Sequence, residues 1–272
     1  MTEVSIIKPK KGLIPIDFKE IYKYRELLWA FVVRDIKVKY KQTVIGGLWA
    51  ILQPLLTMVV FAFFFGKIAK IPSEGVPYPI FSYSGLLLWT YFANSVSNAS
   101  NSMVSGAGLI SKVYFPKIIL PISATLRGLL DYAIAGLIIF GFMFFYKFTP
   151  SIYLFLLPLI LFFTWMLAAG IGFWLSAINV KYRDVKYVFP FFIQLWIYAT
   201  PVIYPASVAG QFEWVVKLNP MSGLIEAHRA MILGHHAINF GMLGISILFA
   251  MIIFITGAFY FKSVERYFAD II

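Results

Sequence analysis

The acidic and histidine side chains are the residues that could support acid–base catalysis or metal binding, and they are few and scattered. Outside the N-terminal region the acids are Glu74, Asp131, Asp184, Glu213, Glu226, Glu265 and Asp270. This scatter argues against the carboxylate pair that glycosyl chemistry requires. His235 and His236 are adjacent but have no third ligand nearby, so we interpret them as a solvated turn, with a metal site as the alternative.

The motifs that support nucleotide hydrolysis and other covalent chemistry are missing from the sequence. There is no Gly-x-x-x-x-Gly-Lys-Ser/Thr phosphate loop, no His-Glu-x-x-His helix and no Gly-x-Ser-x-Gly elbow. The absence of cysteine excludes disulfides and thiolate catalysis. We therefore expect no enzyme and no cofactor or metal bound by this chain. If it takes part in active transport, a partner or an ion gradient supplies the energy.

Arg127 and Asp131 are charged residues within an otherwise apolar stretch. They are four positions apart and so lie on one face of a helix. Because neither charge is tolerated alone at membrane depth, the spacing predicts an ion pair between them, with direct substrate contact as the alternative. Asp131 is also the one carboxylate placed to act in a proton or sodium relay.

A short charged turn between two apolar stretches could make a mechanical contact. Its candidate contact residues are Asn179, Lys181, Tyr182, Arg183, Asp184 and Lys186. The apolar run that follows is about as long as a membrane is thick and ends in Pro201 and Pro205. We interpret the turn as a cytoplasmic knob through which a soluble partner could move the attached helix.

The composition indicates an integral membrane protein. Of 272 residues, 61% are hydrophobic and 13% are charged, and the mean hydropathy is +0.83, whereas soluble domains have about 25% charged residues. We predict an all-α fold with six transmembrane helices: Val44–Phe65 with a kink at Gln53-Pro54, Ile80–Met103, Ile118–Tyr146, Ile152–Ile178, Val185–Tyr204 and Phe240–Phe261.

The distribution of Lys and Arg predicts the orientation. With the N-terminus inside, 17 of these residues flank the spans on the inner side and 5 on the outer side. We therefore expect both termini in the cytoplasm and a cytoplasmic (inner) membrane location. The net charge of +11 is then a feature of topology, so nucleic acid is not an expected partner. The outer segment 205–236, interrupted at Asn219-Pro220, is predicted to form two short helices at the outer leaflet.

Residues 1–41 are predicted to form a cytoplasmic tail followed by an amphipathic interface helix at 18–36, and residues 42–272 the transmembrane domain. Apolar residues recur at helical spacing opposite a basic face, a pattern typical of a helix in the membrane interface. The residues that we assign to its function are Tyr22, Arg25, Trp29, Arg34 and Asp35. The alternative is an amphipathic helix of a soluble domain.

The second predicted span has a polar face. Asn94, Asn98, Asn101 and Ser105 recur at offsets of four, three and four. Lipid would not tolerate this face, so it must meet another helix or water. Helix–helix packing and a channel lining remain equal alternatives.

Aromatic residues make up 19% of the chain. Aromatic faces attract the C–H faces of sugars, and amides and hydroxyls exchange hydrogen bonds with them, so together they could hold a sliding sugar chain. The candidate channel-lining residues are Trp89, Tyr91, Phe92, Asn94, Asn98, Asn101, Phe192, Trp196 and Tyr198. Packing, or a place in the interfacial aromatic belt, is the alternative for each aromatic residue.

Several long segments resemble the membrane subunits of ABC-type polysaccharide exporters, which include O-antigen, capsule and teichoic-acid exporters. The matching segments are RDIKVKYKQTVIGGLWAILQPLLTMVVF (34–61), PYPIFSYSGLLLWTYFANSVSNASNSMV (77–104), KVYFPKIILP (112–121), NVKYRDVKYVFPFFIQLWIYATPVIYP (179–205) and LNPMSGLIEAHR (218–229). The resemblance extends over nearly everything after about residue 20.

The resemblance implies a homodimer of six-span subunits with a channel between the protomers and two cytoplasmic ATPase subunits that bind ATP and Mg²⁺. It implies that 179–186 is the coupling helix, that 18–36 is the interface helix and that 205–235 forms gate helices. The implied substrate is a lipid-linked polysaccharide. The alternatives are an ABC-type drug or small-lipid exporter, a glycan-modifying membrane enzyme and a gradient-driven flippase.

Overall fold

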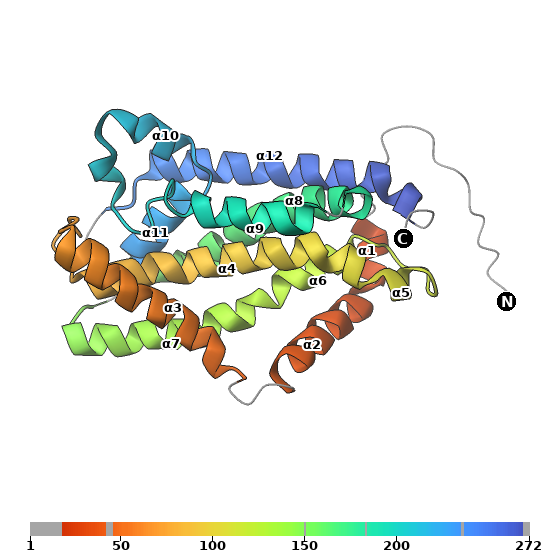
Figure 1. Ribbon diagram of the computed structural model, residues 1–272, viewed down its shortest axis with the longest axis horizontal. Helices are drawn as coiled ribbons and strands as arrows, with labels where there is room; N and C mark the ends of the chain where they lie inside the picture. The colour runs from red at the N-terminus through yellow and green to blue at the C-terminus, as the bar shows by residue number, and fades with distance from the viewer. Residues whose placement is uncertain (1–17, 42–45, 150, 183, 235–236, 269–272) are drawn as a thin grey trace.

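The computed structural model describes residues 18–41, 46–149, 151–182, 184–234 and 237–268, and every regular element within these ranges is helical. The long helices lie side by side along one axis (Figure 1). The α-helices are α1 (Phe18–Lys23), α2 (Arg25–Lys41), α3 (Leu48–Phe61), α4 (Tyr78–Ser105), α5 (Ala107–Ile110), α6 (Ile119–Leu126), α7 (Gly128–Tyr146), α8 (Leu157–Lys181), α9 (Val185–Trp196), α10 (Glu213–Leu218), α11 (Ser222–Leu233) and α12 (Phe240–Val264). A π-helix (Ala62–Ile68) continues α3, and 3₁₀ turns occur at Ile152–Leu156, Ala206–Phe212 and Glu265–Tyr267.

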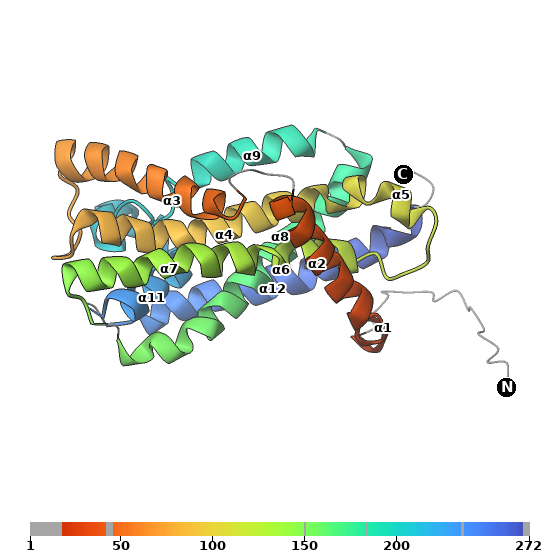
Figure 2. The same ribbon diagram turned by 90° about the horizontal axis from the view of Figure 1, so that it is seen from below.

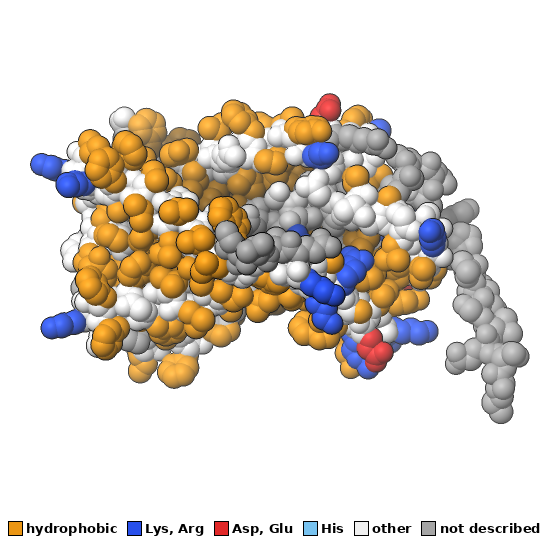
Figure 3. Space-filling view, turned by 60° about the horizontal axis from the view of Figure 1, so that its bottom comes forward, with side chains coloured by type: hydrophobic (Ala, Val, Ile, Leu, Met, Phe, Trp, Pro, Cys, Tyr) orange, Lys and Arg blue, Asp and Glu red, His pale blue; other side chains and the backbone are white. Residues whose placement is uncertain are grey.

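Among the described residues, four helical segments are long and apolar enough to cross a membrane, and they correspond to four of the six predicted spans. They are Leu48–Ile68, Ile119–Tyr146, Ile152–Lys181 and Phe240–Val264. Hydrophobic side chains cover the middle of the face shown in Figure 3, whereas Lys and Arg lie mainly toward its ends. The chain is therefore an all-helical, multi-pass membrane protein.

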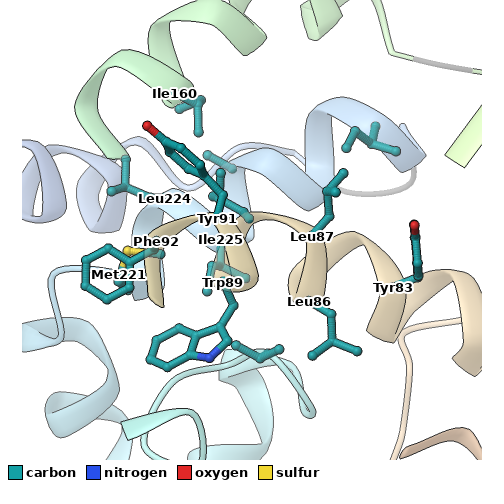
Figure 4. Close-up of a cluster of buried hydrophobic side chains, with 14 of the residues drawn as sticks. Tyr83, Leu86, Leu87, Trp89, Tyr91, Phe92, Ile160, Met221, Leu224 and Ile225 are labelled. Carbon is teal, nitrogen blue, oxygen red and sulfur yellow. The ribbon is translucent and has the colours of Figure 1, made fainter. Parts of the chain in front are cut away.

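The helix α4 is long enough to span but too polar to be one of these four segments. Its 28 residues include a run of serines and asparagines, and more than half of its side chains are buried by α3, α6, α7, α8 and α11. Lipid cannot satisfy such groups, so a polar helix is stable only inside the bundle. Figure 4 shows part of this core, formed by Tyr83, Leu86, Leu87, Trp89, Tyr91, Phe92, Ile160, Met221, Leu224 and Ile225.

The predicted fifth span is wrong in length. The helix α9 ends at Trp196 rather than at Tyr204, and its 12 residues extend over about 18 Å, less than the roughly 30 Å of a bilayer core. The hydroxyl of Thr200 donates to the carbonyl of Trp196 at 2.8 Å, and the amide of Asn219 donates to Thr200 Oγ1 at 2.8 Å. These bonds, together with Pro201, end the helix in a turn.

The helices α8 and α12 touch backbone to backbone. A Cβ atom added at Gly257 would lie 2.3 Å from the carbonyl oxygen of Gly170, and one added at Gly170 would lie 2.6 Å from the backbone of Phe254. Small residues permit this close approach. In lipid the hydrophobic effect does not drive helices together, so the van der Waals packing of such close contacts drives helix association instead.

Enlarging these glycines is expected to separate the two helices. Gly257→Val should lower the free energy of unfolding by roughly 1–3 kcal/mol, the usual cost of overpacking. Gly244→Val is the matched control, because Gly244 lies on the same helix and no atom surrounds its added Cβ within 4 Å. Titration with a denaturing detergent measures both variants. Equal midpoints for the two variants would contradict the role of this contact.

Candidate functional site

A groove between α3, α4 and α9 is the candidate site, because its lining combines polar and aromatic side chains. Its volume is about 560 Å³. The polar lining residues are Gln53, Thr57, Thr90, Asn94, Ser97 and Gln194, and the aromatic lining residues are Trp89, Phe191 and Tyr198. Figure 2 shows α3, α4 and α9 side by side.

The chemistry of this groove suits a neutral, hydroxyl-rich ligand. None of the described residues that line it is charged. The amides of Asn94 and Gln194 can both donate and accept hydrogen bonds, while Trp89 and Tyr198 offer aromatic surface. An ion would find no charged partner among these residues. The remaining lining residues offer apolar surface beside the polar groups: Leu86, Ala93, Pro190, Ile193, Leu195 and Ile197.

The predicted channel residues separate into three groups in the structure. Trp89, Asn94 and Tyr198 line the groove. Tyr91 and Phe92 are buried in the core, and Phe92 packs edge-on against Trp196 with ring centroids 5.5 Å apart. Phe192 is exposed on α9 outside the groove, and Asn98 and Asn101 also lie outside its lining. Trp196 also lies outside the lining, against Phe92. Three of the predicted residues therefore share one groove, and the channel assignment stays a prediction.

Sequence reasoning missed the remaining polar lining residues. Gln53 and Thr57 are one helical turn apart on α3, and the Thr57 hydroxyl donates to the Gln53 carbonyl at 2.9 Å. Thr90, Asn94 and Ser97 recur at offsets of four and three on α4. This spacing could have been detected in the sequence, because Thr90 lies one helical turn before Asn94 and so continues the polar face toward the N-terminal end of α4.

The charged turn connects α8 to α9 as predicted, with Lys181, Tyr182, Asp184 and Lys186 exposed. Arg183 lies outside the described residues. Asn179 corrects the prediction: its side chain is buried, and its amide donates to the carbonyl of Ser100 at 2.9 Å and to Asn101 Oδ1 at 3.4 Å.

This buried amide gives Asn179 a different role from its neighbours in the turn. A buried residue cannot contact a soluble partner, so Asn179 fastens the end of α8 to α4 instead. The contact also explains part of the polar face of α4, because Asn101 meets another helix rather than the groove.

The predicted interface helix consists of α1 and α2, which are separated at Tyr24 and cross the end of the bundle obliquely (Figure 2). It docks through Phe31 and Val32, and the Phe31 ring meets Phe115 with centroids 5.6 Å apart. Tyr22 and Trp29 are exposed, as expected for residues that face a membrane interface. Arg25 stacks over the Tyr22 ring, and Arg34 pairs with Asp35 at 2.8 Å.

The predicted ion pair between Arg127 and Asp131 is wrong, because α2 supplies the partner of each. Arg127 Nη1 lies 4.0 Å from Asp35 Oδ2, and Lys39 Nζ lies 2.6 Å from Asp131 Oδ2. The Tyr40 hydroxyl also donates to Asp131, and burial together with this carboxylate raises the pKa of Tyr40. The four-residue spacing correctly places Arg127 and Asp131 on one face, but that face meets α2, which supplies Asp35 and Lys39.

The segment that we predict on the outer side contains the two short helices that were expected, α10 and α11, at the end of the bundle opposite α1 and α5 (Figure 1). Buried Arg229 holds α11 in place: its Nη1 donates to Glu226 at 2.9 Å, and its Nη2 donates to the carbonyls of Pro201 and Val202 at 2.9 and 3.1 Å. The adjacent His235 and His236 lie outside the described residues.

Comparisons with known proteins identify the family to which the sequence is similar. Residues 26–233 match the model of the family described as "ABC-2 type transporter". The "O-antigen export system permease protein RfbA" of Klebsiella pneumoniae is 28% identical over 249 residues, which cover 91% of this chain and 95% of that protein.

Two further relatives extend these similarities. The protein of the same name from Myxococcus xanthus is 29% identical over 221 residues, which cover 80% of this chain and 84% of that protein. The "Polysialic acid transport protein KpsM" of Escherichia coli is 22% identical over 217 residues, which cover 75% of this chain and 80% of that protein. Since the family model covers most of the sequence, this chain belongs to the ABC-2 type transporter family.

Proposed function

We propose that this chain is the transmembrane subunit of an ABC transporter that exports a polysaccharide. Membership of the ABC-2 family supports the transport role, and the relatives named for O-antigen export and polysialic acid transport support the substrate class. The observation that carries the proposal is the uncharged groove between α3, α4 and α9, whose amides and aromatic rings suit a sugar chain. Lipid-linked polysaccharide is the substrate that we infer.

ATP hydrolysis in a separate cytoplasmic subunit would power export, with ATP and Mg²⁺ bound by that partner. The exposed turn containing Lys181, Tyr182, Asp184 and Lys186 is the proposed contact, because it joins α8 to α9 and α9 forms one wall of the groove. Displacement of the turn would then change the width of the groove. In this mechanism the chain itself does no covalent chemistry.

A second copy of the chain would complete the channel. Exposed apolar side chains border the groove, including Leu56 and Val59 on α3 and Phe191 and Leu195 on α9. Two protomers that pack through these surfaces would enclose two grooves between them, which supports the proposed homodimer. We place the complex in the cytoplasmic membrane with both termini inside. Of the six proposed crossings, α4 forms one, and α9 together with the turn that follows it, residues 197–204, forms another. The helices α10 and α11 are the proposed gate helices on the outer side.

Blocking the groove is expected to stop export. Ser97→Trp places a large side chain on the groove wall of α4. We expect it to reduce export by about tenfold or more, because the indole would displace the sugar chain from the position that transport requires. Leu137→Trp is the control, because Leu137 is exposed on α7 outside the groove. Export of labelled polysaccharide into vesicles by the complex with its ATPase measures the effect. Wild-type export by an assembled Ser97→Trp complex would refute this path.

A further inference from the structure

The first turn of α7 contacts the interface helix and the outer helix α11 through adjacent residues. The Asp131 carboxylate accepts a hydrogen bond from Lys39 Nζ of α2 at 2.6 Å and another from the hydroxyl of Tyr40. The hydroxyl of the next residue, Tyr132, lies 2.7 Å from Nε2 of His228 on α11. Both Tyr132 and His228 are buried, so this second contact lies inside the bundle.

This turn has little room to move independently of its neighbours. A Cβ atom added at Gly128 would lie 2.8 Å from Ser95 Oγ and 3.2 Å from the ring of Tyr91, both on α4. The Tyr91 and Tyr132 rings also meet edge-on with centroids 6.1 Å apart. The α4 side of the turn is closed, and the cavity beside Asp131 and Tyr132 has a volume of only about 30 Å³. We therefore expect a displacement received at Asp131 to pass along α7.

The contact at His228 continues to the groove. The next residue, Arg229, donates to the carbonyls of Pro201 and Val202 in the segment that follows α9. Asn219, just before α11, donates to the carbonyl of Ala199 at 3.0 Å in the same segment. The end of α9 is therefore tied to α11, and α9 forms one wall of the groove.

We propose that Asp131 and Tyr132 are positioning residues for transport, which transmit displacement of the interface helix α2 to α11 and from there to the end of α9. The inference rests on the proposed function. It adds a connection between the two ends of the bundle that does not pass through the turn between α8 and α9. The expected consequence of breaking it is wasted ATP hydrolysis, not loss of the complex.

Two nearly isosteric variants test the connection. Asp131→Asn removes the charge that Lys39 meets, and Tyr132→Phe removes the hydroxyl bonded to His228 while keeping the ring. Tyr83→Phe is the matched control, since the Tyr83 hydroxyl is also buried and donates to α7, at the carbonyl of Ala135, but does not touch α11. Lys39→Met breaks the first contact from the exposed side and replaces Asp131→Asn if that complex does not assemble.

The measurement is the amount of polysaccharide exported per ATP hydrolysed by the complete complex in vesicles. We expect each variant to lower this ratio by about fivefold, within the range of coupling changes seen for such networks, and the double variant to be no worse than the lower single variant. The Tyr83→Phe complex should keep the wild-type ratio.

Three results would overturn the inference: an unchanged ratio in Asp131→Asn and Tyr132→Phe, effects that multiply in the double variant, or an equal loss in Tyr83→Phe. These results leave the proposed function intact as long as the wild-type complex exports polysaccharide. A wild-type complex that hydrolyses ATP without moving any polysaccharide would instead overturn the proposed function, and the inference with it.

Discussion

Replacing Arg183 and Asp184 together by alanine is expected to reduce export by about tenfold or more while the complex with the ATPase still forms. Asp184 is exposed where α8 meets α9, beside exposed Lys181 and Lys186. Buried Asn179 fastens the end of α8 to α4, so the turn is attached to the bundle and can transmit force. Without its charged contact the partner would hydrolyse ATP without moving α9.

The control for this double variant removes both charges of an ion pair on α10, at the end of the molecule opposite the turn. Glu213 and Lys217 form an exposed pair at 2.9 Å on α10, and Glu213→Gln with Lys217→Met removes the same number of charges. We expect this control to export normally although α10 is a proposed gate helix, because both side chains are exposed and lie outside the groove. Export and ATPase activity are measured on the same vesicles, and normal export by the Arg183/Asp184 variant would remove the turn from the mechanism.

Replacing Arg229 by methionine is expected to produce the largest loss of stability among single substitutions in the outer segment. The guanidinium is 3% exposed, lies 3.8 Å from the centre of the Phe81 ring and is bonded to Glu226 and two backbone carbonyls. Removing one partner of a buried ion pair costs about 3–5 kcal/mol, and we expect the lower end because Glu226 is partly exposed.

Lys217→Met is the matched control for Arg229→Met. Lys217 also lies in the segment 205–234, and it pairs with Glu213 four positions away on α10, much as Arg229 pairs with Glu226 three positions away on α11. The side chains of the Lys217–Glu213 pair are 44% and 52% exposed, so its loss should cost less than about 1 kcal/mol. Titration with a denaturing detergent compares the two variants. If both midpoints shift equally, Arg229 does not anchor α11.

The sequence predicted the architecture better than the polar contacts, for a physical reason. Runs of apolar residues report directly on lipid exposure, so four of the six predicted spans coincide with apolar helices among the described residues. The end of α9 could not be predicted in this way, because Asn219 ends it from 19 residues downstream of Thr200. Apolar residues continue past Trp196, so hydropathy gave no sign of the turn.

Partner choice at buried polar residues was the other failure. Asn179 belongs to a charged stretch of sequence, yet it packs against Asn101, 78 positions earlier. Asp131 meets Lys39, 92 positions away, rather than Arg127, because α2 packs against α6 and brings Lys39 to the first turn of α7. Helical spacing identifies the face on which a side chain lies, but it does not identify the helix that covers that face. The groove was predicted only in part, through Trp89, Asn94 and Tyr198, because helical spacing did not show that α3 and α9 cover this face of α4.

The central claim is that this chain is a polysaccharide conduit driven by a separate ATPase. The most direct test uses vesicles that contain the purified chain with or without its ATPase partner, together with labelled polysaccharide and ATP. The account predicts ATP-dependent polysaccharide movement with both proteins present and neither movement nor ATP hydrolysis with this chain alone. Hydrolysis by the isolated chain, or movement that persists without the partner and stops when an ion gradient is dissipated, would contradict it.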